Sequence, residues 1–299
     1  FVSTALAFVR QGAKIVFADS RSDRPGIDED AIESLITEKT KAIVPVHYAG
    51  VACDMDKIMA IANKHNIFVV EDAAQAIDSY YTGKDGVKKA LGSIGHLAAF
   101  SFHETKNIQS GEGGLLAIND ERFISRAEII WEKGTNRAEF FRGEVNKYGW
   151  VDTGSSFLPS EVVAAFLWAQ LEDLDKIQNR RKLIWDNYFK LLKPLELSGL
   201  VKVPIIPGCT TNNGHMFYLI FNDIDSRSNI IAKLKENSVN SVFHYLSLHK
   251  SIYYNSKHDG RILTRSDMFA DTLLRLPMYF DLENEQIKQI CDVIISQVK

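Results

Sequence analysis

The chain has no long hydrophobic run and no marked excess of charge of either sign, and each shortage excludes a class of protein. None of its stretches approaches the roughly 18 consecutive apolar residues that a membrane-spanning helix needs. Its 35 basic and 38 acidic residues leave a formal charge of −3, which argues against a general nucleic-acid binder. We therefore expect a cytoplasmic protein that binds neither membrane nor nucleic acid.

Cysteine is also scarce. The three cysteines, Cys53, Cys209 and Cys291, are far apart, odd in number and in no metal-binding spacing, which fits a reducing compartment. No cluster of histidines and carboxylates indicates a metal, so we expect none. The apolar content of 45% and charged content of 24% are those of an ordinary globular protein, and 299 residues suffice for two domains.

The first half of the chain alternates apolar runs with helical segments, as α/β proteins do. Near-continuous apolar runs suit a mostly parallel sheet that is covered on both faces. An acidic stretch opens a helix that ends near Ile36, and Asp54 is predicted to cap another that ends at His65. Five runs are predicted strands, at residues 14–18, 41–47, 67–71, 96–102 and 114–118.

The pattern changes from Ser160, which is predicted to start a helix that is interrupted before Arg180 and resumes to Leu192. Strand-like and helical runs then alternate and predict a smaller α/β domain. We expect a large domain at residues 1–175 and a small C-terminal domain at residues 176–299. The strand-like runs are at residues 216–221 and 239–246, and the helical runs at 227–237, 266–274 and 284–298.

Asp72 and Lys106 each follow a predicted strand of the first half. Ligands of open α/β sheets collect beyond the carboxyl ends of the strands, so the two side chains are expected in one site. A lysine can form a Schiff base with an aldehyde cofactor, and a carboxylate can keep a basic ring nitrogen protonated. Taken singly, Lys106 is equally well a solvated surface charge, and Asp72 a turn residue at the end of a strand.

Asp72 with Gln75 three positions on, and Ser101 with Lys106 five positions on, resemble the DegT/DnrJ/EryC1/StrS family of sugar aminotransferases. The resemblance runs the length of the chain. It implies the PLP-dependent transferase fold of type I, which is aspartate aminotransferase-like, and pyridoxal 5′-phosphate (PLP) as cofactor. The family's phosphate-binding turn lies upstream of the residue that matches Phe1, so we expect an N-terminal segment that is missing from this sequence.

The resemblance also implies roles for the four matching residues. Lys106 holds the cofactor and then moves a proton as general base, and Asp72 pairs with the protonated ring nitrogen. Gln75 approaches the ring near its 3′-oxygen, and Ser101 donates a hydrogen bond to the phosphate.

Two further cofactor contacts follow from the resemblance. Phe1 matches an aromatic residue that stacks on the cofactor ring, the alternative being a buried strand aromatic. Ser156 stands where the family usually has an asparagine that reaches the phosphate from the neighbouring subunit. Since such sites are completed across a two-fold interface, the family implies a homodimer with shared active sites.

The residues on the substrate side are less distinctive. His244 and His249 match a family segment near the sugar, although a lone histidine is more often a packing or surface residue. Arg137 and Lys147 supply positive charge for the diphosphate of a nucleotide sugar, the alternative being a solvated loop with scattered charge.

Four stretches are most similar to family members that make dTDP-4-amino-4,6-dideoxygalactose, a class of product used in surface polysaccharides such as enterobacterial common antigen. The expected reaction transfers an amino group from L-glutamate to dTDP-4-keto-6-deoxy-D-glucose. Amination of another nucleotide-linked keto sugar, at C3 or C4, is the main alternative. A non-catalytic PLP-binding relative is another, and Lys106 argues against a related dehydratase that has histidine there. The stretches are residues 44–53, 100–107, 133–137 and 154–160.

Overall fold

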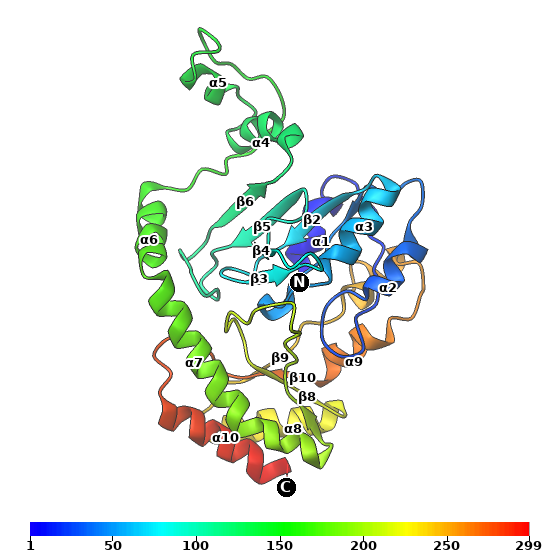
Figure 1. Cartoon of the computed structure of the whole chain (residues 1–299), viewed down its shortest axis with the longest axis vertical. Coiled ribbons are helices and arrows are strands. Elements are labelled where there is room, and N and C mark those ends of the chain that lie inside the picture. Colours follow the sequence, from blue (N-terminus) through cyan, green and yellow to red (C-terminus); the bar gives the residue numbers. More distant parts are fainter. Residues whose placement is uncertain (299) are drawn as a thin grey trace.

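Two four-stranded sheets organise the chain, one in each half, and a long helix runs from the first toward the second (Figure 1). The computed structural model describes residues 1–298. The strand order is β1-β2-β5-β6 in the first sheet and β7-β8-β10-β9 in the second. A separate hairpin is formed by β3 (Tyr80–Thr82) and β4 (Lys88–Ala90).

The first sheet is mixed and mostly parallel, as predicted. β1 (Ala42–Ile43), β2 (Phe68–Asp72) and β5 (Leu97–Ser101) run parallel, and β6 (Gly114–Ile118) runs antiparallel to β5. The last three of these strands lie within one residue of their predicted bounds. Because parallel strands end at one edge of a sheet, the segments that follow β2 and β5 lie near each other.

The helix α3 (Met55–His65) connects β1 to β2 and packs against the sheet. The Asp54 side chain accepts a hydrogen bond of 3.1 Å from the Lys57 N–H, which caps the helix as predicted. Asn66 ends the helix in the left-handed conformation. Its buried face joins Val69 of β2 in one hydrophobic cluster and consists of Met55, Ile58, Ile61 and Ala62.

The prediction of a strand at residues 14–18 is wrong. This segment pairs with no strand among the described residues, because side chains take up its backbone groups instead. The Tyr254 hydroxyl bonds both the N–H and the carbonyl of Ile15, and Arg261 donates to the Phe17 carbonyl at 2.7 Å. An apolar run therefore gave no strand where no neighbouring strand was there to pair with it.

The predicted strand at residues 41–47 is shorter than expected. β1 holds only two residues, and Pro45, which has no N–H, follows it. Pairing resumes as a single parallel bridge between Val46 and Asp72. There the His47 N–H donates to the Asp72 carbonyl at 3.1 Å, and the Asp72 N–H donates to the Pro45 carbonyl at 2.9 Å. This bridge ties the segment after β1 to the end of β2.

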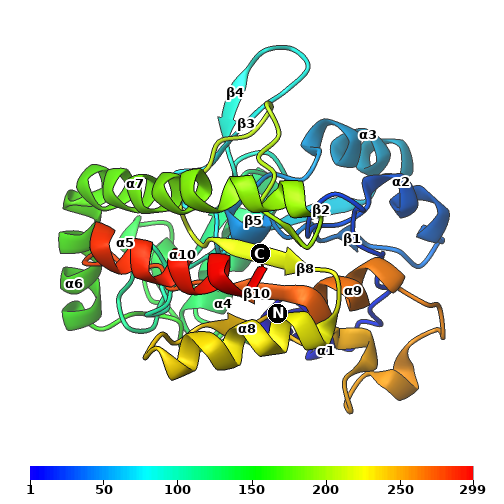
Figure 2. The same ribbon diagram turned by 90° about the horizontal axis from the view of Figure 1, so that it is seen from below.

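The helix predicted to start at Ser160 is present and is interrupted at Asp173, before Arg180. α6 (Glu161–Glu172) begins after Ser160, whose hydroxyl accepts a hydrogen bond from the Val163 N–H. α7 (Leu174–Leu192) continues along the second sheet. Figure 2 shows α10 (Asn284–Val298) between α7 and α8 (Ile224–Glu236), and α10 contacts both.

The second sheet is wholly antiparallel. Its strands are β7 (Val201–Lys202), β8 (Tyr218–Phe221), β10 (Leu273–Arg275) and β9 (Val242–Phe243). Only two residues of the run at 239–246 are strand. The helix predicted at residues 266–274 ends two residues early, because α9 (Thr264–Thr272) leads directly into β10.

Each half has its own hydrophobic cluster. One extends from Ile32 to Ala98 and the other from Ile184 to Val298. A third, smaller cluster joins Ala49, after β1, to Tyr218 and Leu273 of the second sheet. The division into domains at residues 175 and 176 stays a prediction, although the two large clusters agree with it.

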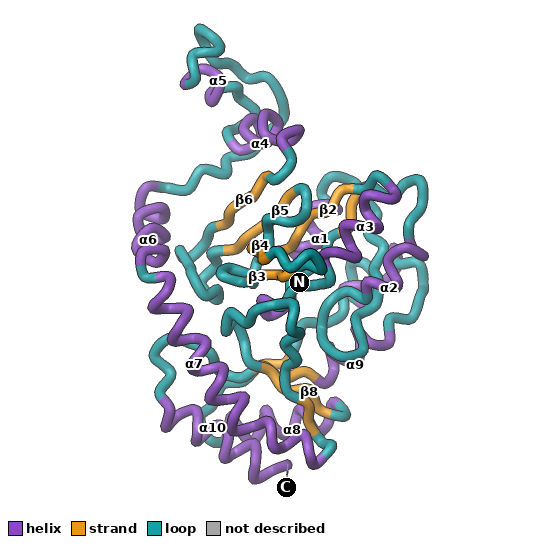
Figure 3. Tube along the Cα trace, in the orientation of Figure 1, coloured by secondary structure: helices purple, strands orange, loops and turns teal. Residues whose placement is uncertain are grey.

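Residues 119–160 form a lobe that projects from the edge of the first sheet (Figure 3). It contains the short helices α4 (Ile124–Trp131) and α5 (Arg137–Phe141), joined by loops. Two other short helices, α1 (Val2–Val9) and α2 (Glu29–Ile32), lie in the first half. None of the helices in residues 1–298 is long and apolar enough to cross a membrane.

Candidate active site

Asp72 is the last residue of β2, and its carboxylate is fixed by donors from two segments. The Thr4 hydroxyl of α1 donates to one oxygen at 2.6 Å, and the Ala74 N–H donates to the other at 3.1 Å. On the backbone, the next residue, Ala73, donates its N–H to the Ala99 carbonyl of β5 at 2.9 Å. The carboxylate therefore has a defined orientation beyond the carboxyl end of the sheet.

Lys106 lies on the turn that follows β5, and its amine faces a mixed electrostatic environment. Burial lowers the pKa of Lys106 below its ordinary value, the nearby Asp72 carboxylate raises it, and the Arg275 guanidinium lowers it further. A lower pKa makes more of the amine available as the neutral nucleophile that reacts with an aldehyde. The structure thus brings Lys106 and Asp72 within electrostatic reach of each other.

The turn that carries Lys106 is anchored through the buried side chain of the next residue, Asn107. Its amide nitrogen donates to the Gln178 side chain and to the Asn213 carbonyl, both at 2.9 Å. Its oxygen lies 2.8 Å from His215 Nδ1. Burial keeps the pKa of His215 well below its ordinary value, so this histidine is neutral and donates from Nδ1. Lys106 is thereby linked to α7 and to the segment before β8.

Gln75 is oriented by the segment after β1. Its side-chain oxygen accepts a hydrogen bond of 2.6 Å from the Ala49 N–H. Ala49 has a φ of +56°, a left-handed conformation that aims its N–H at Gln75. Asn213 also donates to the Gln75 carbonyl at 2.8 Å. Because the oxygen is already bonded, the amide NH₂ is the group that Gln75 can present to a ligand.

Ser101 ends β5, opposite Gly114 of β6. Its hydroxyl oxygen accepts a hydrogen bond of 3.3 Å from the His103 N–H. The hydroxyl hydrogen therefore remains available for a phosphate oxygen, as the predicted role requires.

His244 lies next to the same segment as Gln75. Its Nδ1 is 3.0 Å from the hydroxyl of Tyr48, the residue before Ala49. Burial, helped by the positive charge of Arg275, lowers the pKa of His244 to about 3, and burial raises the pKa of Tyr48. Both groups are therefore neutral at pH 7. The Tyr48 hydroxyl and Nδ1 of His244 therefore share a hydrogen bond between two neutral groups, and Nδ1 is occupied.

Phe1 lies beside the same group of residues. Its ring centre is 5.1 Å from that of Tyr245, whose ring centre is 5.5 Å from that of His244. Phe1 directly precedes α1 and lies in no strand, and its predicted stacking on the cofactor ring stays a prediction.

The structure does not bring His249 to Lys106. His249 is buried between Phe17 and His258, and its Nε2 lies 3.3 Å from the Asp267 carboxylate. Burial lowers its pKa. The predicted role at the sugar stays a prediction, and these contacts favour the alternative of a packing residue.

Arg137, Lys147 and Ser156 all lie in the projecting lobe (Figure 1). Arg137 forms an ion pair with Glu132 and lies over the ring of Phe141. Ser156 is exposed and pairs through its backbone with Glu132. Within one copy of the chain these residues are therefore not assembled with Lys106.

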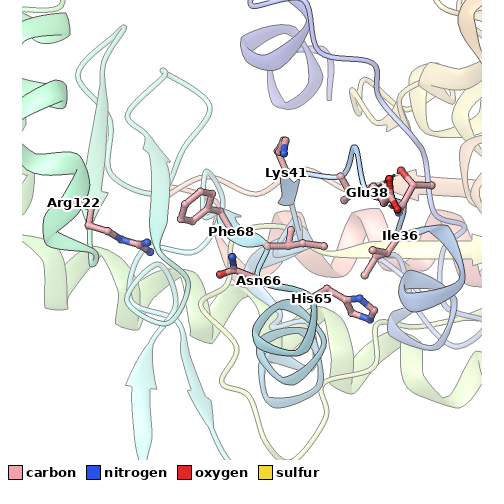
Figure 4. A pocket seen from close by; sticks show the side chains of 10 residues that line it. Ile36, Glu38, Lys41, His65, Asn66, Phe68 and Arg122 are labelled. Atoms are coloured by element: carbon pink, nitrogen blue, oxygen red, sulfur yellow. Dashed lines mark hydrogen bonds between the residues drawn. The ribbon is translucent and has the colours of Figure 1, made fainter.

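A cavity of about 750 Å³ opens at the opposite end of the first sheet (Figure 4). Its lining includes Lys41 before β1, Phe68 at the start of β2, and Arg122 after β6. It therefore lies at the amino ends of the parallel strands, whereas Asp72 and Lys106 lie at the carboxyl ends. It is not the candidate active site.

The residues at the carboxyl edge fit pyridoxal phosphate chemically. The amine of Lys106 has a lowered pKa, the Asp72 carboxylate is held by two donors, and Ser101 and Gln75 can still donate. These groups match an aldehyde, a basic ring nitrogen and two oxygen-bearing substituents.

Sequence reasoning missed several residues of the site. Asn107 could have been found from the sequence, because it adjoins Lys106. Thr4 and Arg275 are remote from Lys106 in the sequence, and no local signal marks them. Only folding brings Thr4 of α1 to Asp72 and Arg275 of β10 toward Lys106.

Comparison with known proteins agrees with this site. Residues 1–295 match the model of the DegT/DnrJ/EryC1/StrS aminotransferase family. The spore coat polysaccharide biosynthesis protein SpsC of Bacillus subtilis is 30% identical over 311 residues, which cover 100% of this chain and 77% of SpsC. Among solved structures, DesV of S. venezuelae is 28% identical with a TM-score of 0.88, over 100% of this chain and 76% of DesV. An aminotransferase from Psychrobacter cryohalolentis is 26% identical with a TM-score of 0.90, and the match covers 99% of this chain and 78% of the Psychrobacter chain.

Proposed function

Because this chain belongs to the DegT/DnrJ/EryC1/StrS aminotransferase family and is a PLP-dependent sugar aminotransferase, we propose a specific reaction for it. An amino group passes from L-glutamate to C4 of dTDP-4-keto-6-deoxy-D-glucose. The products are dTDP-4-amino-4,6-dideoxy-D-galactose and 2-oxoglutarate. The amino sugar would serve in a surface polysaccharide, such as enterobacterial common antigen.

One observation carries the proposed chemistry: a lysine of lowered pKa lies beside a carboxylate at the carboxyl edge of the sheet. When bound, pyridoxal phosphate supplies an electron sink for the carbon that loses its proton. Lys106 would hold the cofactor through its amine, and its Nζ would take the proton from the donor carbon and return one to the acceptor carbon. Asp72 keeps the ring nitrogen protonated, which sustains the electron sink.

The other residues of the site bind and orient the cofactor or the sugar and take no part in bond making or breaking. Gln75 donates its amide to the ring substituent, and the Ser101 hydroxyl donates to the phosphate. Phe1 covers one face of the ring. Nε2 of His244 is available for a hydrogen bond with a hydroxyl of the sugar, because Nδ1 is occupied by Tyr48.

We also propose that two copies of the chain complete each site. The lobe and the adjoining α6 expose a set of large apolar side chains that a lone protein would have to leave in water. The set includes Trp131, Phe141, Trp150, Phe157, Val162 and Trp168. A second copy would cover this surface and receive Ser156, Arg137 and Lys147 near its cofactor and nucleotide.

The reaction can be tested with purified enzyme, L-glutamate and a small panel of nucleotide-linked keto sugars. Bound cofactor should show an absorbance band that glutamate bleaches, and NMR of the product should show a C4 amine with galactose configuration. A band that glutamate leaves unchanged would contradict the transaminase. A C3 amine, or a different preferred sugar, would contradict only the substrate.

A further inference from the structure

His47 and Glu71 form a fully buried pair that takes no part in the proposed reaction. Glu71 directly precedes Asp72 in β2, and the two side chains point to opposite faces of the sheet, because successive side chains of a strand alternate. His47 Nε2 lies 2.9 Å from a Glu71 carboxylate oxygen, and neither side chain is exposed. A polar pair is costly to bury, so its contacts indicate what it holds in place.

His47 is fixed through both ring nitrogens and through its backbone. The Cys53 N–H donates to His47 Nδ1 at 3.3 Å, so Nε2 carries a proton and donates a hydrogen bond to Glu71. The His47 N–H donates to the Asp72 carbonyl at 3.1 Å. His47 is therefore tied to two successive residues of β2, to one by its side chain and to the other by its backbone.

Glu71 is a rigid partner, because four donors hold its carboxylate. Besides His47, the donors are the N–H groups of Gly92, Ile94 and Gly95, at 2.7, 2.8 and 2.6 Å. Burial raises the pKa of Glu71, but the hydrogen bonds from His47 and from the backbone lower it more, so the group is charged at pH 7. Rotation of the carboxylate would leave buried donors unpaired. Its bond to His47 thus fixes that residue relative to the sheet.

The turn that follows His47 carries two contacts of the candidate active site. The Tyr48 hydroxyl is 3.0 Å from His244 Nδ1, and the Ala49 N–H donates to the Gln75 side-chain oxygen at 2.6 Å. Ala49 reaches Gln75 in a left-handed conformation, with a φ of +56°. This conformation is unfavourable for alanine by itself, so the turn keeps its shape only while the surrounding structure holds it.

We propose that His47, held by Glu71, is a positioning residue for Gln75. It fixes the turn that presents the Ala49 N–H, and that N–H occupies the Gln75 oxygen and leaves the amide NH₂ to face the cofactor ring. The inference rests on the proposed function, in which Gln75 binds the cofactor, and adds a residue on which this binding depends. His47 itself contacts neither cofactor nor substrate.

Affinity for pyridoxal phosphate gives a readout that does not depend on turnover. The apoenzyme is titrated with cofactor, and the rise of the absorbance band gives the dissociation constant. His47→Asn keeps an acceptor for the Cys53 N–H but does not reach Glu71, so it should weaken cofactor binding by roughly 5- to 30-fold. His47→Gln, whose amide can still donate to Glu71, should bind within about threefold of wild type.

A double-mutant cycle separates positioning of Gln75 from a general loss of structure. Gln75→Ala should weaken cofactor binding by itself. If His47 acts through Gln75, adding His47→Asn to that variant should weaken binding by no more than about a further twofold. Independent effects of the two substitutions would multiply, and that result would overturn the inference.

His96→Asn is the matched control. His96 Nδ1 also accepts a hydrogen bond from a backbone N–H, that of Val69 in β2, at 2.9 Å, and asparagine again keeps an acceptor there. His96 precedes β5 and so lies at the end of the sheet opposite to Lys106. Cofactor affinity should therefore not change. An equal loss of affinity in His96→Asn and His47→Asn would contradict a specific role for His47.

Circular dichroism checks that each variant folds. If His47→Asn does not fold, His47→Met, an apolar side chain of similar length, takes its place in the titration and in the cycle. Wild-type cofactor affinity in either folded variant would overturn the inference. A wild-type apoenzyme that does not bind pyridoxal phosphate, or a Gln75→Ala variant that binds it as tightly as wild type, would instead overturn the proposed function of the site.

Discussion

At the scale of single residues, the site depends on neighbours that change what a common side chain can do. Burial and Arg275 lower the pKa of Lys106 against the opposing Asp72 carboxylate, which favours the neutral amine that the proposed role requires. His244 stays neutral because burial suppresses its charge, and Tyr48 occupies its Nδ1. None of these properties is visible in a residue type alone.

Replacement of Lys106 by alanine should abolish turnover, with loss of at least about 10³-fold, because both the attachment and the proton transfer are removed. Cofactor should still bind without a covalent bond, since Asp72, Gln75 and Ser101 remain. Absorbance spectroscopy and equilibrium dialysis would check this. Normal turnover in the variant would refute the role of Lys106.

His244 should make folding stability depend on pH. Its pKa is about 3 in the folded protein and about 6.5 when unfolded, so between these values the unfolded state binds the extra proton. Stability should therefore fall as the pH is lowered through this window. Between pH 7.5 and 5, the free energy of unfolding of His244→Asn, measured with urea, should fall by about 2 kcal/mol less than that of wild type.

Tyr48→Phe provides the control for that measurement, because it removes the hydrogen bond to His244 but leaves the titrating ring. It should keep the wild-type pH dependence at a lower overall stability. An identical pH dependence in wild type and His244→Asn would show that His244 titrates normally in the folded protein.

At the scale of elements, short segments are stabilised by particular end groups. α3 is the clearest case, because Asp54 caps its first turn and also accepts a hydrogen bond of 3.1 Å from the Tyr81 hydroxyl of β3. The same helix was predicted correctly because capping and helical periodicity are local signals. The strand predicted at residues 14–18 failed because strand formation depends on a partner elsewhere in the chain.

Asp54→Ala should lower the free energy of unfolding by about 1–2 kcal/mol, as loss of an N-cap does, with the Tyr81 contact adding to it. The helix lies away from Lys106, so half-saturation by glutamate should not change. Chemical denaturation and the bleaching assay measure the two effects. Asp56→Ala, in the first turn of the same helix, is a comparison that keeps the cap.

At the scale of the whole molecule, the two halves meet where the chemistry is expected. Asn107 links the turn of Lys106 to α7 and to Asn213, and the third hydrophobic cluster joins Ala49 to the second sheet. The lobe, in contrast, projects away and leaves its apolar surface uncovered within one copy. The molecule therefore has a site built by both halves and a surface suited to a second copy.

Trp168→Glu on α6 should dissociate the proposed homodimer, because it places a charge in the apolar contact. Sedimentation should show a monomer. Cofactor affinity and turnover should both be reduced in this variant, since each site would lose Ser156 of the other copy. Leu197→Glu, at a 92% exposed apolar position beyond α7, should leave the assembly intact. A monomeric wild-type enzyme with full activity would contradict the shared site.

The sequence by itself determined the order of most helices and strands, the α/β class and the pairing of Asp72 with Lys106. These follow from local periodicity, capping and the rule that parallel strands end at one edge. Only the tertiary structure decided that Thr4 orients Asp72, that Arg275 and Tyr48 join the site, and that His249 packs elsewhere. It also placed Arg137, Lys147 and Ser156 in a lobe outside the site of one copy. The physical reason is that contacts across the sheet, burial and the pKa shifts that they cause depend on residues far apart in the chain.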